Sequence, residues 1–274
     1  MNRAVFVLAL LITLPSHALQ VSVSPTETLE IAERSAVVKI DGKLDEAVWA
    51  SLDQYDEFVV IEPDTLVKPA HATWVSLFYN QLGLYVGVQV EQPPETRIAR
   101  LSSRDNRQIK RDSVGMVLDT SGEGRYCYWF GINLGDAQMD GTLLPEKQFT
   151  SDWDGAWEGA TSETQTGWTA EMFIPWGVVS MPKQAGARRI GLYMERFVAY
   201  KDERWSWPAL PDTVPQFISA LQSVSVKDVQ PKQQYSIFPS ASVTQDQIDG
   251  KTNYRAGADF FWRPSTNLQL TATI

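Results

Sequence analysis

Short apolar runs separated by turn residues are the feature that most constrains the fold of this chain. Runs rich in Val, Ile, Tyr, Phe and Trp recur along it, and Gly, Pro, Asn and Asp cluster between them. Such runs predict strands, because branched and aromatic side chains favour extended backbone while the intervening residues favour turns. Strands are expected over residues 36–40, 73–79, 83–91, 112–119, 125–133, 138–144, 157–164, 167–174 and 190–198. This series predicts an all-β domain, an antiparallel β-sandwich of the jelly-roll type.

The pattern within these segments also predicts which side chains are buried. On the strand over residues 167–174, alternation places Trp168 in the core and Glu171 on the opposite face, at the surface or in a groove. One short helix is expected over residues 45–52, where Asp45 can act as the N-terminal cap. Its amphipathic pattern directs Trp49 against the underside of the sheet as a plug.

The N-terminus has the layout of a secretory signal peptide. Arg3 gives it a positive charge, residues 4–14 are uniformly apolar, and Ser16-His17-Ala18 places small residues at the cleavage positions. The apolar run is shorter than the roughly 20 residues of a spanning helix, which disfavours the alternative of an uncleaved anchor. We therefore expect residues 1–18 to be removed, and residues 19–35 to lead into a sandwich over residues 36–225.

Charge and cysteine content disfavour several classes of function. The formal net charge is −9, so no nucleic-acid partner is expected, since phosphate binding needs a basic face. Cys127 is the only cysteine, so no internal disulfide can form, and a buried, inert thiol is expected. A catalytic thiol would need a nearby histidine and a haem would need axial His or Met ligands; His71, the one histidine after the signal segment, lies in a polar connection where a surface position is expected.

The character of the chain changes after a polar, proline-containing linker over residues 226–234. In residues 235–274, apolar positions alternate with small or polar ones, as in strands that face lipid on one side. The alternating apolar residues are Tyr254, Ala256, Ala258, Phe260 and Trp262, then, after a turn, Leu268, Leu270, Ala272 and Ile274. The pattern predicts the start of a truncated membrane β-barrel. Because the sequence stops within a strand pattern, a fragment or a shortened gene product is expected.

Four stretches of sequence, taken together, resemble a known family. They are Ile40-Asp41-Gly42-Lys43-Leu44-Asp45-Glu46-Ala47-Val48-Trp49; Ala72-Thr73-Trp74-Val75 with Leu84-Tyr85-Val86-Gly87-Val88; Arg104-Asp105 with Val117-Leu118-Asp119-Thr120; and Trp153-Asp154-Gly155-Ala156-Trp157 with Gly167-Trp168-Thr169-Ala170-Glu171 and Ile174-Pro175-Trp176. Over residues 36–225 they resemble the family 9 carbohydrate-binding modules, in the version that precedes an outer-membrane β-barrel domain of unassigned function. The resemblance implies a sugar held between two aromatic rings, with charged and amide side chains bonded to its hydroxyls. It also implies export to the periplasm or outer membrane of a Gram-negative type of bacterium.

The strongest local candidates for sugar contacts lie between the expected strands 138–144 and 157–164. Trp153, Trp157, Asp152 and Asp154 combine two stacking rings with two carboxylates in a turn-rich connection, where binding groups are commonly displayed. In extended backbone, residues four apart share a face, which would place both rings on one side. The alternative is that Trp157 begins a strand and packs inside, while Trp153 only covers an edge.

A second set of candidate contacts carries charges or amides. Arg104, Asp105 and Arg125 offer hydrogen bonds to sugar hydroxyls, and Asn133 and Asp140 stand at strand ends that flank the same connection. The alternative is a network of surface ion pairs, which contribute little energy when they are exposed.

Carbohydrate binding in support of polysaccharide breakdown or uptake is therefore the predicted function. One alternative is a periplasmic cap domain without a sugar site. Another is glycoside hydrolysis, which needs two carboxylates about 5–10 Å apart across a cleft; Asp152 and Asp154 alternate like strand neighbours, but no acid in a plainly apolar setting accompanies them. No cofactor is required, and structural calcium is an open alternative without assigned ligands, since acidic exported sandwiches often hold it through Asp side chains and carbonyls.

Overall fold

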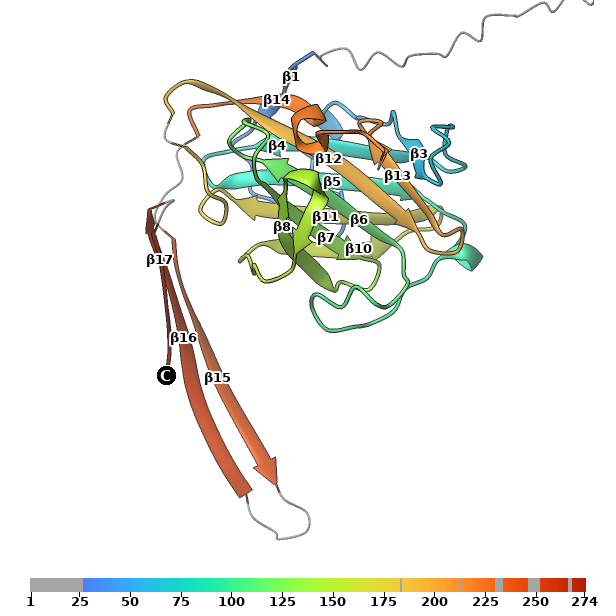
Figure 1. Cartoon of the computed structure of the whole chain (residues 1–274). Helices are drawn as coiled ribbons and strands as arrows, with labels where there is room; N and C mark the ends of the chain where they lie inside the picture. The colour runs from blue at the N-terminus through green and yellow to red at the C-terminus, as the bar shows by residue number, and fades with distance from the viewer. Residues whose placement is uncertain (1–26, 183, 212, 230–233, 246–251, 266–267) are drawn as a thin grey trace, which may run out of the picture.

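The computed structural model describes residues 27–182, 184–211, 213–229, 234–245, 252–265 and 268–274 (Figure 1). The expected signal peptide, the first part of the lead-in and residues 230–233 of the linker lie outside the described residues. Within the described ranges, no helix is long and apolar enough to span a membrane. The helical segments are short 3-10 turns: η1 (Trp49–Ser51), η2 (Pro94–Thr96), η3 (Pro145–Lys147) and η4 (Phe217–Ala220).

Two sheets pack face to face and form a β-sandwich, so the predicted all-β fold is confirmed. The larger sheet runs in the order β1 (Leu29–Glu30), β14 (Gln222–Lys227), β12 (Ala187–Val198), β6 (Ser113–Asp119), β7 (Cys127–Asn133), β8 (Gln138–Leu144) and β9 (Gln148–Thr150), with β13 (Glu203–Trp207) beside β12 and β3 (Val59–Glu62) beside β13. The smaller sheet runs in the order β10 (Glu158–Glu163), β11 (Gly167–Pro175), β5 (Gly83–Glu91), β4 (Thr73–Tyr79) and β2 (Ala32–Glu33). Only the short pairs β1–β14 and β2–β4 are parallel among these strands.

Local alternation located the long strands well. The predicted segments 73–79, 83–91 and 138–144 coincide with β4, β5 and β8. Residues 36–40 form no strand, and the helix predicted over residues 45–52 is reduced to the single turn η1. The sequence did not indicate β1, β2, β3, β9, β13 or β14. These strands are at most six residues long, and β1 and β2 have two residues each, too few for an alternating pattern.

The core lies between the two sheets, where alternate side chains of each strand point inward. Val88 on β5, Met116 on β6, Phe130 on β7 and Trp168 on β11 have no exposed surface, which confirms the prediction for Trp168. The predicted burial of the Cys127 thiol is also confirmed, on the outer face of the larger sheet, where burial raises its pKa.

A buried guanidinium ties the two sheets together at one end of the core. Arg196 on β12 is fully buried, and its Nη1 donates to the Thr73 hydroxyl at 2.9 Å. Its Nη2 donates to the Glu91 carbonyl at 2.9 Å and to Gln92 Oε1 at 3.2 Å. Burial lowers the pKa of Arg196 to about 9, while the nearby carboxylate of Asp112 opposes the shift. The larger sheet is thus fastened to β4 and to the end of β5.

A second buried charge lies on the outer face of the smaller sheet, beneath the segment that leads into η1. Trp49 covers this face with 5% of its surface exposed, as predicted, and its ring packs edge-on to Phe78 at 5.3 Å. Glu171 is fully buried below it, so its predicted place at the surface or in a groove was wrong. Its Oε1 accepts the Trp49 indole N–H at 3.0 Å, and its Oε2 accepts the amides of Asp41 and Gly42 at 3.0 and 2.9 Å. Glu171 is buried because the segment from Asp41 to Trp49 covers this outer face of the sheet.

The tail forms a separate antiparallel sheet that projects beyond the sandwich in Figure 1, in the order β15 (Gln234–Gln245), β16 (Thr252–Ser265) and β17 (Leu268–Thr273). The alternation predicted in residues 254–262 and 268–274 is confirmed, and β15 adds a third strand. The register aligns one row of apolar residues across all three strands: Tyr235, Ile237, Pro239, Ala241 and Val243; Tyr254, Ala256, Ala258, Phe260 and Trp262; Leu270 and Ala272. The large side chains of this row are exposed.

The buried Glu171 generates a pH dependence of stability. Burial raises its pKa from 4.5 to about 7, although the three N–H donors oppose the shift. The folded state therefore binds the proton more tightly than the unfolded chain, so this stabilisation is fully present below about pH 4.5 and is lost as the pH rises through about 7. We expect the free energy of unfolding to fall between pH 5 and 7 more steeply in the wild type than in Glu171→Gln, measured by denaturant titration. Equal slopes in the two proteins would contradict this assignment.

Candidate functional site

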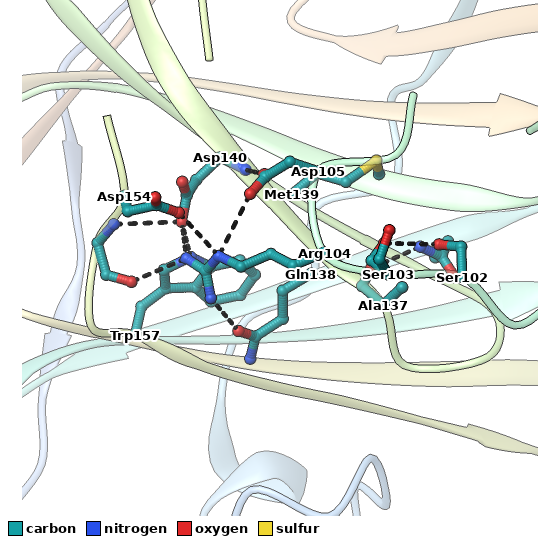
Figure 2. A network of polar contacts seen from close by, with 12 residues as sticks. Ser102, Ser103, Arg104, Asp105, Ala137, Gln138, Met139, Asp140, Asp154 and Trp157 are labelled. Carbon is teal, nitrogen blue, oxygen red and sulfur yellow. Dashed lines mark hydrogen bonds and ion pairs between the residues drawn. The ribbon is translucent and has the colours of Figure 1, made fainter. Parts of the chain in front are cut away.

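Arg104 and three other predicted contact residues, Asp105, Asp140 and Asp154, form one network (Figure 2). Its Nη2 donates to Asp140, and its Nε donates to Asp154 Oδ1 at 3.1 Å and lies 3.5 Å from Asp105 Oδ2. Its Nη1 donates to Gln138 Oε1 at 2.9 Å, and Nη2 also reaches the Gly155 carbonyl at 2.9 Å. The guanidinium therefore connects the loop before β6, strand β8 and the loop before β10.

The two predicted stacking rings lie beside this network but pack against the core. Trp157 is 4% exposed, and its indole N–H donates to Asp140 Oδ2 at 2.7 Å. Trp153 is half-buried, and its ring lies 4.8 Å from Tyr128 and 5.7 Å from Phe130. Trp157 also packs on Phe130, at 5.5 Å. The structure thus adopts the alternative in which Trp157 packs inside and Trp153 covers its edge.

The remaining predicted contacts lie outside this network. Arg125 is exposed in the β6–β7 connection, 3.6 Å from Glu123. Asn133 is fully buried at the end of β7 and donates to the Ala137 carbonyl. Asp152 is exposed, and its amide donates to Thr150 Oγ1. Sugar contact by any of the nine residues stays a prediction.

Arg104 pairs with three carboxylates in this network, while the buried Asp140 Oδ1 has no hydrogen-bond partner among the described residues. The carboxylate oxygens of Asp105, Asp140 and Asp154 lie within 4.8 Å of one another, an oxygen set that suits a hard cation such as calcium. The guanidinium of Arg104 lies among these oxygens and supplies positive charge itself. Burial raises the pKa of Asp140, while the Trp157 N–H and Arg104 oppose the shift. Four bonds from three nitrogens of Arg104 leave few donors for a ligand, so the arrangement favours a structural role.

A second site, which the sequence did not indicate, lies on the outer face of the larger sheet. Gly131 on β7 pairs with Gly115 on β6, and Gly141 on β8 pairs with Trp129. A Cβ at Gly131 would lie 2.6 Å from the Trp129 ring, and one at Gly115 would lie 2.9 Å from Glu195 Oε1. The glycines thus form a bed without side chains, on which the half-buried indole of Trp129 lies close to the backbone.

Charged groups surround this ring. Trp129 Nε1 donates to Glu195 Oε1 at 2.8 Å, and Arg204 Nη1 donates to Glu195 Oε2 at 3.1 Å. The nearby carboxylate of Glu195 is the main reason that the pKa of Arg204 is raised. The guanidinium of Arg107 lies 5.2 Å from the centre of the Trp129 ring and 4.0 Å from that of Phe149.

The loop of residues 106–111 and the sheet enclose a hollow of about 220 Å³ above these groups. We call it the Trp129 groove, lined by Arg107, Lys110, Arg111, Trp129, Glu195 and Arg204. The one sequence signal for this groove was Gly131, which alternates with bulky residues along β7. However, its meaning depends on the pairing of β6, β7, β8 and β12, which a single sequence does not show.

Comparison with solved structures finds the same fold in proteins described as carbohydrate-binding. A family 9 carbohydrate-binding module from Caldicellulosiruptor kristjanssonii in complex with cellotriose is similar at 15% identity and a TM-score of 0.51, over 73% of this chain and 94% of that chain. The same kind of module in complex with glucose has 15% identity and a TM-score of 0.52, over 75% and 97%. A candidate carbohydrate-binding protein from Bacteroides uniformis has 14% identity and a TM-score of 0.55, over 73% and 99%. No family model and no curated protein matches the chain. At these identities, the likeness establishes the shared fold.

The Arg104 network predicts that replacing Arg104 destabilises the fold far more than replacing Arg125. Arg104→Leu leaves three neighbouring carboxylates without their cation, so we expect a loss of about 3 kcal/mol, the lower end for a broken buried pair because 36% of the Arg104 side chain is exposed. The matched change Arg125→Leu removes an exposed pair and should alter stability by less than about 0.5 kcal/mol. Denaturant unfolding of both variants measures the difference. Equal losses would show that the network does not stabilise the fold.

Proposed function

We propose that the sandwich binds carbohydrate in the Trp129 groove. The observation that carries this proposal is the indole of Trp129, which lies on a bed of glycines with the Glu195 carboxylate and the Arg204 guanidinium at its rim. A flat aromatic ring beside paired donors and acceptors is the combination that sugar recognition needs. The proposal extends to support of polysaccharide breakdown or uptake by an exported protein.

The chemistry of a pyranose explains this choice. One face of the sugar ring presents C–H groups, which pack on an aromatic face, while its hydroxyls point outward and need donors and acceptors. Glu195 accepts hydrogen bonds, Arg204 donates them, and charged partners strengthen such bonds. The hollow of about 220 Å³ is smaller than the roughly 300–1,000 Å³ of pockets for drug-sized ligands. It therefore suits a single sugar ring rather than a long chain.

The structural neighbours support sugar binding at a coarse level. Two of them are family 9 modules whose structures contain cellotriose or glucose. The fold alone does not determine a function, since function depends on the site built on the fold. The groove supplies such a site in this chain.

Calorimetric titration with glucose, cellotriose and a panel of other mono- and oligosaccharides tests the proposal. It also distinguishes binding in the Trp129 groove from binding beside the Arg104 network. We expect saturable binding to at least one sugar. We expect Trp129→Ala to weaken it at least 10-fold, because the substitution removes the aromatic surface on which the C–H groups of the sugar pack. Trp153→Ala reports on the sequence-predicted contact beside Arg104, and we expect it to retain binding.

Two results would redirect the proposal. A loss of binding in Trp153→Ala but not in Trp129→Ala would move the site to the Arg104 network. Failure of the folded wild type to bind any sugar in the panel would favour the alternative, a periplasmic cap domain that contacts other proteins.

We also propose that the sheet of β15, β16 and β17 lies against the hydrocarbon of an outer membrane. Its aligned apolar row has aromatic residues toward both ends, Tyr254 at one end and Tyr235 paired with Trp262 at the other. The eight residue steps from Tyr254 to Trp262 span about 26 Å at ~3.3 Å per residue. The apolar band of membrane strands between its aromatic girdles is about 25 Å tall.

Flotation with phosphatidylcholine vesicles tests this location. Ala241→Asp places a charge in the middle of the apolar row, while Ser240→Asp places it on the adjacent, opposite-facing position. We expect the wild type and Ser240→Asp to float with the vesicles and Ala241→Asp to lose most of this association, because charge on a lipid-facing position is unfavourable. Equal flotation of the two variants, or none by the wild type, would contradict the proposal.

A further inference from the structure

The charge of the Trp129 groove is opposite to that of the whole chain. The chain carries a formal net charge of −9. The residues that line the groove include four cations, Arg107, Lys110, Arg111 and Arg204, and one carboxylate, Glu195. A cationic hollow in an acidic protein concentrates positive potential at one place.

Two of the four cations are already neutralised by carboxylates. Arg204 pairs with Glu195 at 3.1 Å and with Glu62 at 3.2 Å. Lys110 Nζ lies 2.6 Å from Asp202 Oδ1. Within the described ranges, no ion pair joins Arg107 or Arg111 to a carboxylate. Their charges are therefore available to a ligand.

Arg111 is the more unusual of these two residues, because it is only 3% exposed. Its Nη2 donates to the Asn106 carbonyl at 2.7 Å, while its Nη1 is buried and finds no hydrogen-bond partner in the described part of the chain. Burial lowers the pKa of Arg111, because removing its charge from water is unfavourable. Buried guanidinium groups without acceptors are rare, because losing hydration without a replacement is unfavourable. An anionic oxygen in the groove would supply the missing acceptor.

Arg107 lies where a ligand would stack. Its side chain is exposed, and its guanidinium sits over the rings of Phe149 and Trp129. A neutral sugar that stacks on Trp129 would displace this cation from the ring and offer it only hydroxyls. A carboxylate on the sugar would offer it a charge-assisted, bidentate partner instead.

We propose that the Trp129 groove selects sugars that carry a carboxylate, namely uronic acid residues, through Arg107 and Arg111. This inference rests on the proposed carbohydrate binding and names the class of sugar. The indole and the Glu195–Arg204 pair hold the sugar ring and its hydroxyls, and the two unpaired arginines hold the carboxylate. Selection then comes from two cations that have no ion pair with a carboxylate in the part of the chain that the structure describes.

Titration of the full chain with matched acidic and neutral sugars tests the inference. The probes are glucuronate and galacturonate oligosaccharides, with cellotriose and a galactose oligosaccharide as neutral counterparts. We expect the wild type to bind an acidic oligosaccharide at least 10-fold more tightly at low salt, with the preference shrinking as sodium chloride is raised, because salt screens exposed charges. Arg107→Gln and Arg111→Gln should each lower the preference several-fold while retaining affinity for the neutral counterpart.

Arg189→Gln is the matched control, since Arg189 is an exposed cation on β12, outside the groove. It should keep the full preference. Because Arg111 is buried, Arg107→Gln carries the test if Arg111→Gln unfolds. Equal or tighter binding of neutral sugars by the wild type would overturn the inference while leaving carbohydrate binding intact. Absence of binding to both classes would overturn carbohydrate binding as well.

Discussion

The structure depends on the buried guanidinium of Arg196, because it fixes how the two sheets face each other. A charge without water needs several acceptors, and those of Arg196 come from the end of β5 and the start of β4. Asp112 completes the arrangement: its carboxylate accepts the Gln92 amide at 2.8 Å and the Ala199 backbone N–H at 2.8 Å. Successive side chains of a strand point to opposite faces, so holding Arg196 inward directs Glu195 outward. The interaction of Arg196 that closes the core therefore also directs the Glu195 carboxylate toward the Trp129 groove.

The outer face of the larger sheet has two regions, one covered by apolar side chains and one left open. Around Tyr193 it is closed, since Phe217 packs edge-on to that ring at 5.0 Å, and Leu210 and Ile218 belong to the same apolar cluster. Farther along the strands, glycines replace these side chains, and the sheet is open to the loop of residues 106–111. A cluster that is closed by apolar contacts stabilises the fold, whereas a hollow that holds a half-buried aromatic ring beside charged groups leaves a surface for a ligand. Both arise from the choice of residue at alternate positions of β6, β7 and β12.

The sequence predicted what is local and missed what depends on distant pairing. Alternation identified β4, β5 and β8 to the residue, because each buries a face over at least seven positions. Trp49 was correctly placed against the sheet, but Glu171 was not, since the segment that buries it is separated from it by about 120 residues of sequence. Likewise, Trp153 and Trp157 are close in sequence, yet Phe130 on β7 determines that both rings pack against the core. The Trp129 groove is assembled from five strands and a loop, so its existence follows from register, which a single sequence does not reveal.

The two charged clusters of the sandwich differ in the balance of their charges: carboxylates outnumber cations around Arg104, and cations outnumber carboxylates in the Trp129 groove. Around Arg104, one guanidinium meets three carboxylates, an amide oxygen and a carbonyl, and the network joins three segments of chain. In the Trp129 groove, cations outnumber carboxylates, and Arg111 keeps a buried nitrogen without an acceptor. Each cluster leaves one buried atom without a hydrogen-bond partner among the described residues, Asp140 Oδ1 in the first and Arg111 Nη1 in the second, and unmet buried polar groups destabilise the native state. In the groove the unmet atom is a donor, so a ligand that brings an anionic oxygen would recover that cost when it binds. The excess of cations beside an aromatic ring is therefore the physical basis on which the groove is proposed as a binding site.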